Sequence, residues 1–164
     1  DGEIPHAVPG RIGCHLSSQP DLSIGTRSAQ VVVSRRVMED RAMSIFIVEN
    51  HEDTLQYLGH YLSMVGHTVR SARDMASALD DLKTAPADVL ISDIGLPDGD
   101  GWELMRRIKE TGRVPFGIAM SGYGMRSDKE KSLSAGYRHH LVKPFGPDEL
   151  EVLLKEAAAE IAPR

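Results

Sequence analysis

The chain has 164 residues, of which 41% are apolar, and a formal net charge of −5 at pH 7, which suits one domain with a hydrophobic core and a tail. Its acidity disfavours direct binding to nucleic acid, its single cysteine excludes an internal disulfide, and no apolar run is long enough to cross a bilayer. We therefore expect a cytoplasmic protein that contacts neither nucleic acid nor a membrane directly.

Residues 1–43 differ in composition from the rest of the chain. They mix prolines, glycines, serines and arginines without a helical or alternating period, and every Phe, Tyr and Trp lies after position 45. A segment without aromatic residues buries little apolar surface and does not form a core by itself. We predict a poorly structured leader, a linker or a cloning remnant over 1–43, with a short strand or helix near 29–41 as the alternative, and one folded domain over 44–164.

From residue 44 onward, short apolar runs alternate with helical patterns, which is typical of βα units around a parallel sheet. Five strands are predicted, at 44–48, 67–71, 88–92, 115–120 and 139–142. Helices are predicted between them, at 53–65, 74–83, 102–111 and 126–135. A last helix is predicted to begin at Pro147, because proline suits the first helical turn. Three residues follow Ile161, so we expect no output domain after this helix within the chain.

Polar residues stand just after four of the predicted strands. Glu49 and Asn50 follow the first strand, Asp93 the third, Ser121 the fourth and Lys143 the fifth. Because parallel strands have their carboxyl ends at one edge of the sheet, these side chains are expected to face one cleft. An aspartate in such a cleft can attack phosphorus and hold the group as an acyl phosphate. The pattern therefore favours phosphoryl transfer, with Asp93 as the nucleophile.

The other residues of this set suit the same chemistry. Mg²⁺ bound through oxygen ligands would offset the repulsion between the Asp93 carboxylate and the phosphoryl oxygens. Lys143 would supply a positive charge to one phosphoryl oxygen, and the Ser121 hydroxyl would donate a hydrogen bond.

Four segments, in this order, resemble the motifs of the receiver domain of response regulators, including the receivers of hybrid histidine kinases. They lie at 45–50, 92–101, 120–122 and 143–145. The resemblance implies an α/β fold of the flavodoxin-like (βα)5 type, with a doubly wound parallel sheet in the strand order 2-1-3-4-5. It also implies a signalling phosphoacceptor that promotes its own phosphorylation and dephosphorylation, rather than an enzyme with a separate substrate.

The resemblance further implies a role for each residue of the cleft. Asp93 is the phosphoacceptor, which takes the phosphoryl group from a phosphohistidine on a histidine kinase or a phosphotransfer protein. Glu49 and Asn50 hold Mg²⁺ together with Asp93 and the backbone carbonyl of Gly95.

Ser121 and Lys143 take the catalytic hydroxyl and lysine roles of the family, and Ser121 is also a switch residue. The peptide bond between Lys143 and Pro144 is typically cis in this family. The changed surface is read by a downstream output protein or domain, and a homodimer through the last two helices is a further implication.

Asn50 departs from the family pattern, which usually has an aspartate at this position. An amide oxygen still ligates a metal, but it adds no negative charge, so the affinity for Mg²⁺ is predicted to fall. Glu52 or Asp53, further along the chain, are candidates to compensate for the lost charge.

Two histidines are ambiguous from the sequence. His140 stands three residues before Lys143, where the family commonly has a switch aromatic residue, and a histidine there would add pH dependence to the switch. The alternative is that His140 simply lies at a strand surface. His51, beside Glu49, is predicted to face solvent and not to bind a transition metal, because the sequence shows no second ligand at a suitable spacing.

Two other functions stay open at this stage. The first is a degenerate receiver, a phosphorylation-independent interaction module, which Asn50 and His140 would suit. The second is an enzyme on the same fold, such as a flavin protein or a phosphatase with an aspartyl intermediate. The acidic loop after the first strand lacks the glycines and hydroxyls of a phosphate-binding loop, and this disfavours the second function.

Overall fold

The computed structural model describes residues 42–122 and 124–161. A five-stranded parallel sheet forms its centre, in the order β2-β1-β3-β6-β7, which is 2-1-3-4-5 when the strands of this sheet are counted along the chain. The strands are β1 (Ser44–Val48), β2 (Thr68–Ala72), β3 (Val89–Asp93), β6 (Phe116–Ser121) and β7 (His139–Val142). The predicted doubly wound α/β fold is confirmed.

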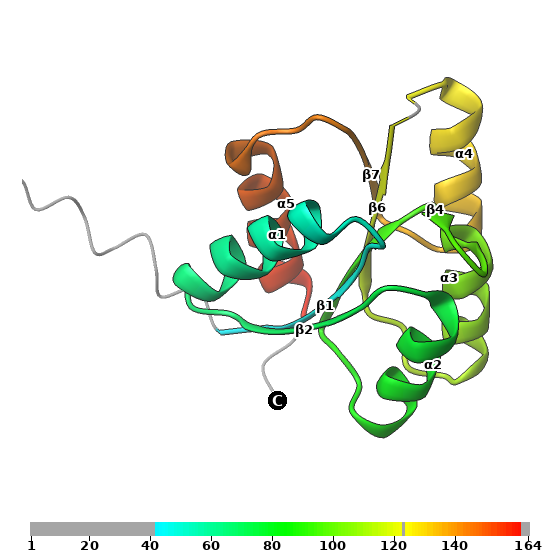
Figure 1. Cartoon of the computed structure of the whole chain (residues 1–164), viewed down its shortest axis with the longest axis horizontal. Coiled ribbons are helices and arrows are strands. Elements are labelled where there is room, and N and C mark those ends of the chain that lie inside the picture. Colours follow the sequence, from blue (N-terminus) through cyan, green and yellow to red (C-terminus); the bar gives the residue numbers. More distant parts are fainter. Residues whose placement is uncertain (1–41, 123, 162–164) are drawn as a thin grey trace, which may run out of the picture. The chain divides into compact units, whose positions relative to one another are not determined.

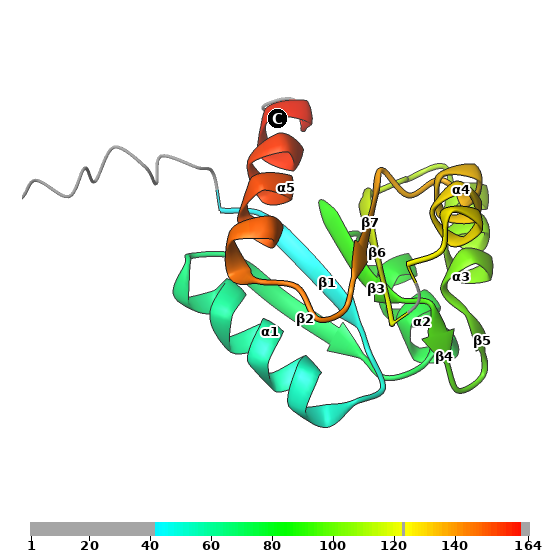
Figure 2. The same ribbon diagram turned by 90° about the horizontal axis from the view of Figure 1, so that it is seen from above.

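Helices cover both faces of this sheet (Figures 1 and 2). The helices are α1 (Glu52–Met64), α2 (Met75–Thr84), α3 (Gly101–Glu110), α4 (Arg126–Ala135) and α5 (Pro147–Glu160). α1 and α5 pack on one face, and α2, α3 and α4 pack on the other. Each predicted end of a strand or helix lies within one residue of the observed end. Among the residues that the structure describes, no helix has the length and apolar character needed to cross a bilayer.

The central strands are largely apolar, apart from a few polar residues mostly at their ends, because both faces of the sheet are covered. Alternate residues of β1 point to opposite faces: Ile45 and Ile47 join the core under α1 and α5, while Phe46 and Val48 join the core under α2 and α3. Met43 is also part of the first core and is only 2% exposed. The folded domain therefore includes a residue that the prediction assigned to the leader, and the rest of the predicted leader, up to residue 41, lies outside the described residues.

A short hairpin, which the sequence did not predict, lies between β3 and α3. Its strands are β4 (Gly95–Leu96) and β5 (Gly99–Asp100), which pair antiparallel. Asp98 lies at the turn and accepts hydrogen bonds from the backbone N–H groups of Met75 (2.8 Å) and Ala76 (2.9 Å) at the start of α2. The loop after β3 is thereby fixed to a neighbouring helix.

The start of α3 approaches the end of β3 closely. A Cβ atom on Gly101 would lie 2.5 Å from the backbone oxygen of Asp93, so only glycine fits at this position. Tyr137, which is 2% exposed, donates a hydrogen bond from its hydroxyl to the Gly101 carbonyl at 2.6 Å. These contacts hold the backbone around Asp93 against the rest of the domain.

Candidate functional site

The carboxyl edge of the sheet brings the predicted residues together. Glu49 follows β1 and Asp93 ends β3, and these two strands are paired up to the residues just before them. Ser121 ends β6, and its backbone carbonyl accepts a hydrogen bond from the N–H of Lys143 at 2.8 Å. The peptide bond between Lys143 and Pro144 is cis, as predicted. Four strands thus deliver one side chain each to the same edge.

Lys143 lies between the two carboxylates. Its Nζ atom is 2.5 Å from Glu49 Oε2 and 3.3 Å from Asp93 Oδ1. Glu49 is fully buried, Asp93 is 7% exposed and Ser121 is 5% exposed, whereas a quarter of the Lys143 side chain remains in contact with solvent. The site is therefore a buried acidic pair whose charge is partly offset by one lysine reaching in from the surface.

The pKa values of the two carboxylates are shifted in opposite directions by this environment. Burial raises the pKa of Asp93 above its ordinary value of 3.8; Lys143 opposes this shift and the negative charge of Glu49 adds to it. Burial also acts to raise the pKa of Glu49, but hydrogen bonds from Lys143 and His51 outweigh burial and hold the pKa below 4.5. Glu49 is thus the stable anion of the pair, and Asp93 is the more basic one.

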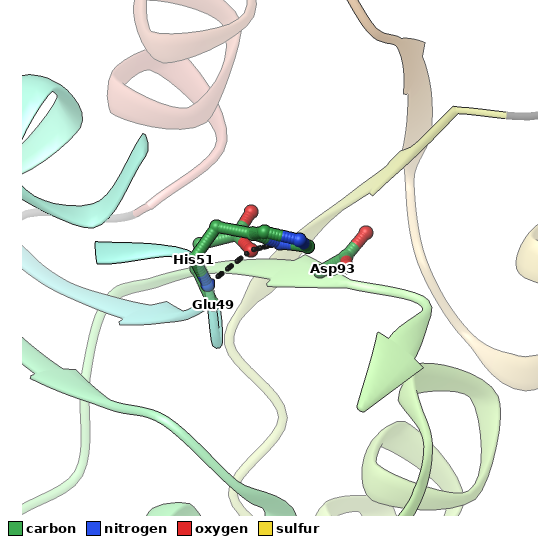
Figure 3. Close-up of side chains that lie close together, drawn as sticks. All are labelled: Glu49, His51 and Asp93. Atoms are coloured by element: carbon green, nitrogen blue, oxygen red, sulfur yellow. Dashed lines mark hydrogen bonds and ion pairs between the residues drawn. The ribbon is translucent and has the colours of Figure 1, made fainter. Parts of the chain in front are cut away.

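Three possible ligand atoms for a cation, from Glu49, His51 and Asp93, lie within 4.8 Å of one another (Figure 3). The His51 ring atom Nδ1 is 3.0 Å from Glu49 Oε1, although 71% of the histidine side chain is exposed. The prediction that His51 faces solvent is confirmed, but Glu49 and Asp93 supply further possible ligand atoms beside it that the spacing along the chain did not indicate. Spacing along the chain did not reveal the third ligand, Asp93, because the sheet brings it next to a residue 42 positions earlier in the sequence.

The remaining predicted metal ligands lie nearby. Gly95 adjoins the nucleophile, since a Cβ atom added to it would lie 3.7 Å from Asp93 Oδ2. Asn50 is exposed at the end of β1. The Glu52 carboxylate pairs with Arg73 and accepts a hydrogen bond from Gln56 Nε2 at 2.8 Å, and compensation for Asn50 by Glu52 or Asp53 stays a prediction.

Comparison with known proteins agrees with this geometry. The family model described as the response regulator receiver domain matches residues 45–155. The chain belongs to this family. The strand order and the edge at which the acidic pair lies are those expected of a receiver.

Two relatives and one solved structure illustrate the similarity. The KDP operon transcriptional regulatory protein KdpE of Escherichia coli is 36% identical over 114 residues, which are 70% of this chain and 50% of KdpE. The sensor protein EvgS of the same organism is 31% identical over 124 residues, 74% of this chain and 10% of EvgS. A CheY-like receiver domain protein from Methanospirillum hungatei superposes with a TM-score of 0.69 at 26% identity, over 73% of this chain and 96% of that one. The chain thus spans about half or less of the length of the first two relatives.

His140 connects β7 of the receiver to its α3 and α4 helices. Its ring atom Nδ1 lies 2.8 Å from Ser132 Oγ, which is fully buried and also accepts a hydrogen bond from Trp102 Nε1 at 2.9 Å. His140 is half-buried, and its role as a switch residue stays a prediction. No signal in the sequence pointed to Ser132, because a serine in a polar helix is ordinarily solvent-facing.

Ser132 also fixes the direction of its hydrogen bond with His140. The serine hydroxyl donates its one proton to the Asp128 carbonyl at 3.0 Å, and Trp102 Nε1 can only donate. The Nδ1 atom of His140 therefore donates to Ser132.

Proposed function

We propose that this receiver takes a phosphoryl group from a phosphohistidine of a histidine kinase or phosphotransfer protein onto Asp93, and that the resulting change of surface is read by an output protein or domain. The observation that carries the proposal is the buried Asp93 carboxylate with the Lys143 ammonium group 3.3 Å away. In this view the chain promotes its own phosphorylation and dephosphorylation and is a signalling phosphoacceptor, without a separate substrate.

In the proposed transfer, one bond to phosphorus forms and one breaks. An Asp93 carboxylate oxygen attacks phosphorus, and the phosphorus–nitrogen bond of the donor breaks. The electron pair of that bond stays with the donor imidazole, which takes up a proton, and Asp93 carries a mixed anhydride. Because burial makes the Asp93 carboxylate more basic, it also makes this oxygen a better nucleophile.

Lys143 and Ser121 are placed to hold the transferred group. The ammonium group of Lys143 already contacts both carboxylates, so a phosphoryl oxygen bound to Asp93 would lie within its reach. Ser121 belongs to the neighbouring strand β6, and we assign its hydroxyl to a second phosphoryl oxygen. The two groups would together offset the charge added to a site that already contains Glu49.

The oxygen atoms of this edge fit a hard divalent cation. The carboxylates of Glu49 and Asp93, the amide of Asn50 and the backbone carbonyl of Gly95 are the residues that would hold Mg²⁺. When bound, Mg²⁺ would neutralise charge on the phosphoryl oxygens. Since Asn50 contributes no negative charge, replacing it with aspartate is expected to increase the affinity for Mg²⁺.

Intact mass tests the proposal. The chain is incubated with Mg²⁺ and acetyl phosphate, a small phosphodonor, and is expected to gain the mass of one phosphoryl group. The Asp93→Asn variant should gain none, whereas the Asp98→Asn variant, changed in the same loop but at a residue that caps α2, should still gain it. Addition to both variants would overturn the assignment of Asp93.

The second candidate is a degenerate receiver that works as a fixed interaction module, which the neutral Asn50 favours. A degenerate receiver would give a different result in the mass experiment. No variant, including one with Asn50→Asp, would gain a phosphoryl group with any divalent cation, and binding to partners would be unchanged by Asp93→Asn.

A further inference from the structure

An imidazole lies beside the two carboxylates of the site. Glu49, His51 and Asp93 are the one group of histidine, cysteine and acidic residues in the described part of the chain whose ligand atoms come close enough together to share a cation. Figure 3 shows the ring of His51 lying between Glu49 and the side of the site where Asp93 stands. The donor set is therefore mixed, with nitrogen as well as oxygen.

The spacing of the atoms suits coordination. Two adjacent ligands of an octahedral ion with bond lengths of about 2.1 Å are roughly 3.0 Å apart. His51 Nδ1 and Glu49 Oε1 are 3.0 Å apart. They are held there because the backbone N–H of His51 also donates to Glu49 Oε1, at 3.0 Å.

The hydrogen bond to Glu49 Oε1 is the one side-chain interaction of His51 in the described part of the chain that an incoming ion would have to replace. His51 is the N-cap residue of α1, with an extended backbone, yet its side chain makes no capping hydrogen bond. Its ring is mostly exposed, so a hydrated ion can reach it and the ring can turn toward the ion without breaking packing.

The position of Lys143 is a second indication that the carboxylates of Glu49 and Asp93 favour a positive charge beside them. Its ammonium group lies against Glu49 Oε2 and Asp93 Oδ1 at once, as a stand-in for the charge that the pair requires. An incoming ion must compete with this lysine, and Asn50 gives it no added negative charge. A further strong ligand, such as an imidazole, would help the ion to compete.

We propose that His51 takes the ligand place left weak by Asn50, and that this nitrogen turns the site toward borderline divalent ions such as Co²⁺ and Ni²⁺. Imidazole suits these ions, whereas Mg²⁺ prefers oxygen ligands alone. The proposal rests on the proposed function only in that both use the carboxylates of Glu49 and Asp93.

The test is a calorimetric titration of the full chain, without a polyhistidine tag and without a phosphodonor, with Co²⁺ and separately with Mg²⁺. Co²⁺ binds most oxygen sites more tightly than Mg²⁺ as well, so the decisive quantity is the dependence on His51. His51→Ala is expected to weaken Co²⁺ binding by about tenfold or more and to change Mg²⁺ binding by less than about twofold. His60→Ala, a change of an exposed histidine on the same helix, is the matched control and should affect neither ion.

Retained Mg²⁺ binding shows that the His51→Ala variant is folded and that its carboxylates are in place. Unchanged Co²⁺ binding in this variant, or an equal loss in His60→Ala, would overturn the proposal. Because no phosphodonor is present, the outcome is independent of phosphoryl transfer. His51-dependent Co²⁺ binding in a chain that cannot be phosphorylated would reject the proposed function alone, and phosphorylation with His51-independent Co²⁺ binding would reject the inference alone.

Discussion

The ionised carboxylate of Asp93 lowers the stability of the fold at neutral pH. A buried carboxylate next to Glu49 is harder to ionise than one in water, and Lys143 offsets this only in part, so the pKa of Asp93 lies above 3.8 in the folded chain. A folded-state pKa above the unfolded value means that the folded state binds the proton more tightly. The contribution of Asp93 to stability is then fully present below pH 3.8 and is lost as the pH rises through the folded pKa.

Replacing Asp93 with asparagine is therefore expected to stabilise the domain at pH 7. The amide has nearly the same shape and no charge, and the ion pair between Glu49 and Lys143 is kept. We expect thermal unfolding to give a Tm higher by about 2–5 °C at pH 7. The gain should appear as the pH rises from about 3.8 through the folded pKa. Asp80→Asn, at an exposed ion pair on α2, should leave the Tm nearly unchanged, and a lower Tm for Asp93→Asn at pH 7 would contradict this account.

Lys143 is expected to matter for folding as well as for chemistry. Lys143→Met leaves the buried Glu49 without its cation, and removing one partner of a buried ion pair typically costs about 3–5 kcal/mol. Urea unfolding should show a loss near the lower end of this range, because Lys143 is partly solvated. Adding Glu49→Gln should recover most of the loss, while Lys129→Met on an exposed helix face should cost almost nothing. Additive effects of the two substitutions would mean that the pair does not interact.

At the scale of the elements, the sequence predicted what apolar periodicity controls. Every strand of the main sheet and every helix was located to within one residue. Most of them bury a run or stripe of apolar side chains, and the more polar α4 lies between two such strands. The edge holding Asp93 and Lys143 followed from the parallel topology. The hairpin of β4 and β5 was missed because two-residue strands have no periodicity. The closeness of His51 to Asp93 and the contact of Trp102 with Ser132 were missed because they join residues far apart in the sequence.

Asp98 illustrates an acid whose role is structural. Its carboxylate accepts hydrogen bonds from the backbone N–H groups of Met75 and Ala76. These bonds, of which the one from Met75 has the larger effect, lower the pKa of Asp98 below 3.8. Asp98→Ala is expected to lower the free energy of unfolding by roughly 1 kcal/mol in urea, the usual effect of losing a helix cap. Because the folded pKa is lowered, this stabilisation is present above pH 3.8 and is lost as the pH falls through the folded value. The difference from the wild type should therefore shrink in acid, and a difference that grows there would exclude the capping role.

At the scale of the whole molecule, α4 and α5 each present an exposed apolar side chain. Leu133 on α4 is 56% exposed and Val152 on α5 is 63% exposed. The predicted homodimer through these helices would cover them. Light scattering after size exclusion is expected to show self-association that increases with phosphodonor and is reduced by Val152→Asp. The same change at Met64, which is exposed on α1, should have no effect, and a monomer under all conditions would contradict the prediction.

The contact of Trp102 with Ser132 offers a reporter of communication across the molecule. Trp102 is the sole tryptophan of the chain, and its indole N–H shares Ser132 Oγ with His140. His140 stands on β7 just before Lys143, so a change at the site that moves this strand would alter the hydrogen bond of the indole. Indole fluorescence is expected to shift when acetyl phosphate and a divalent cation are added. Asp93→Asn should abolish the shift.

The Ser132→Ala variant and the pH dependence of the fluorescence shift distinguish a switch that reaches from the site to Trp102 from an effect confined to the site. Ser132→Ala removes the shared oxygen, so it should suppress the shift in fluorescence while the mass gain on Asp93 persists. A histidine in the place of a switch aromatic residue would add pH dependence to the switch, so the shift is compared at pH 6 and pH 8. Similar shifts at both pH values would argue against a pH-gated switch.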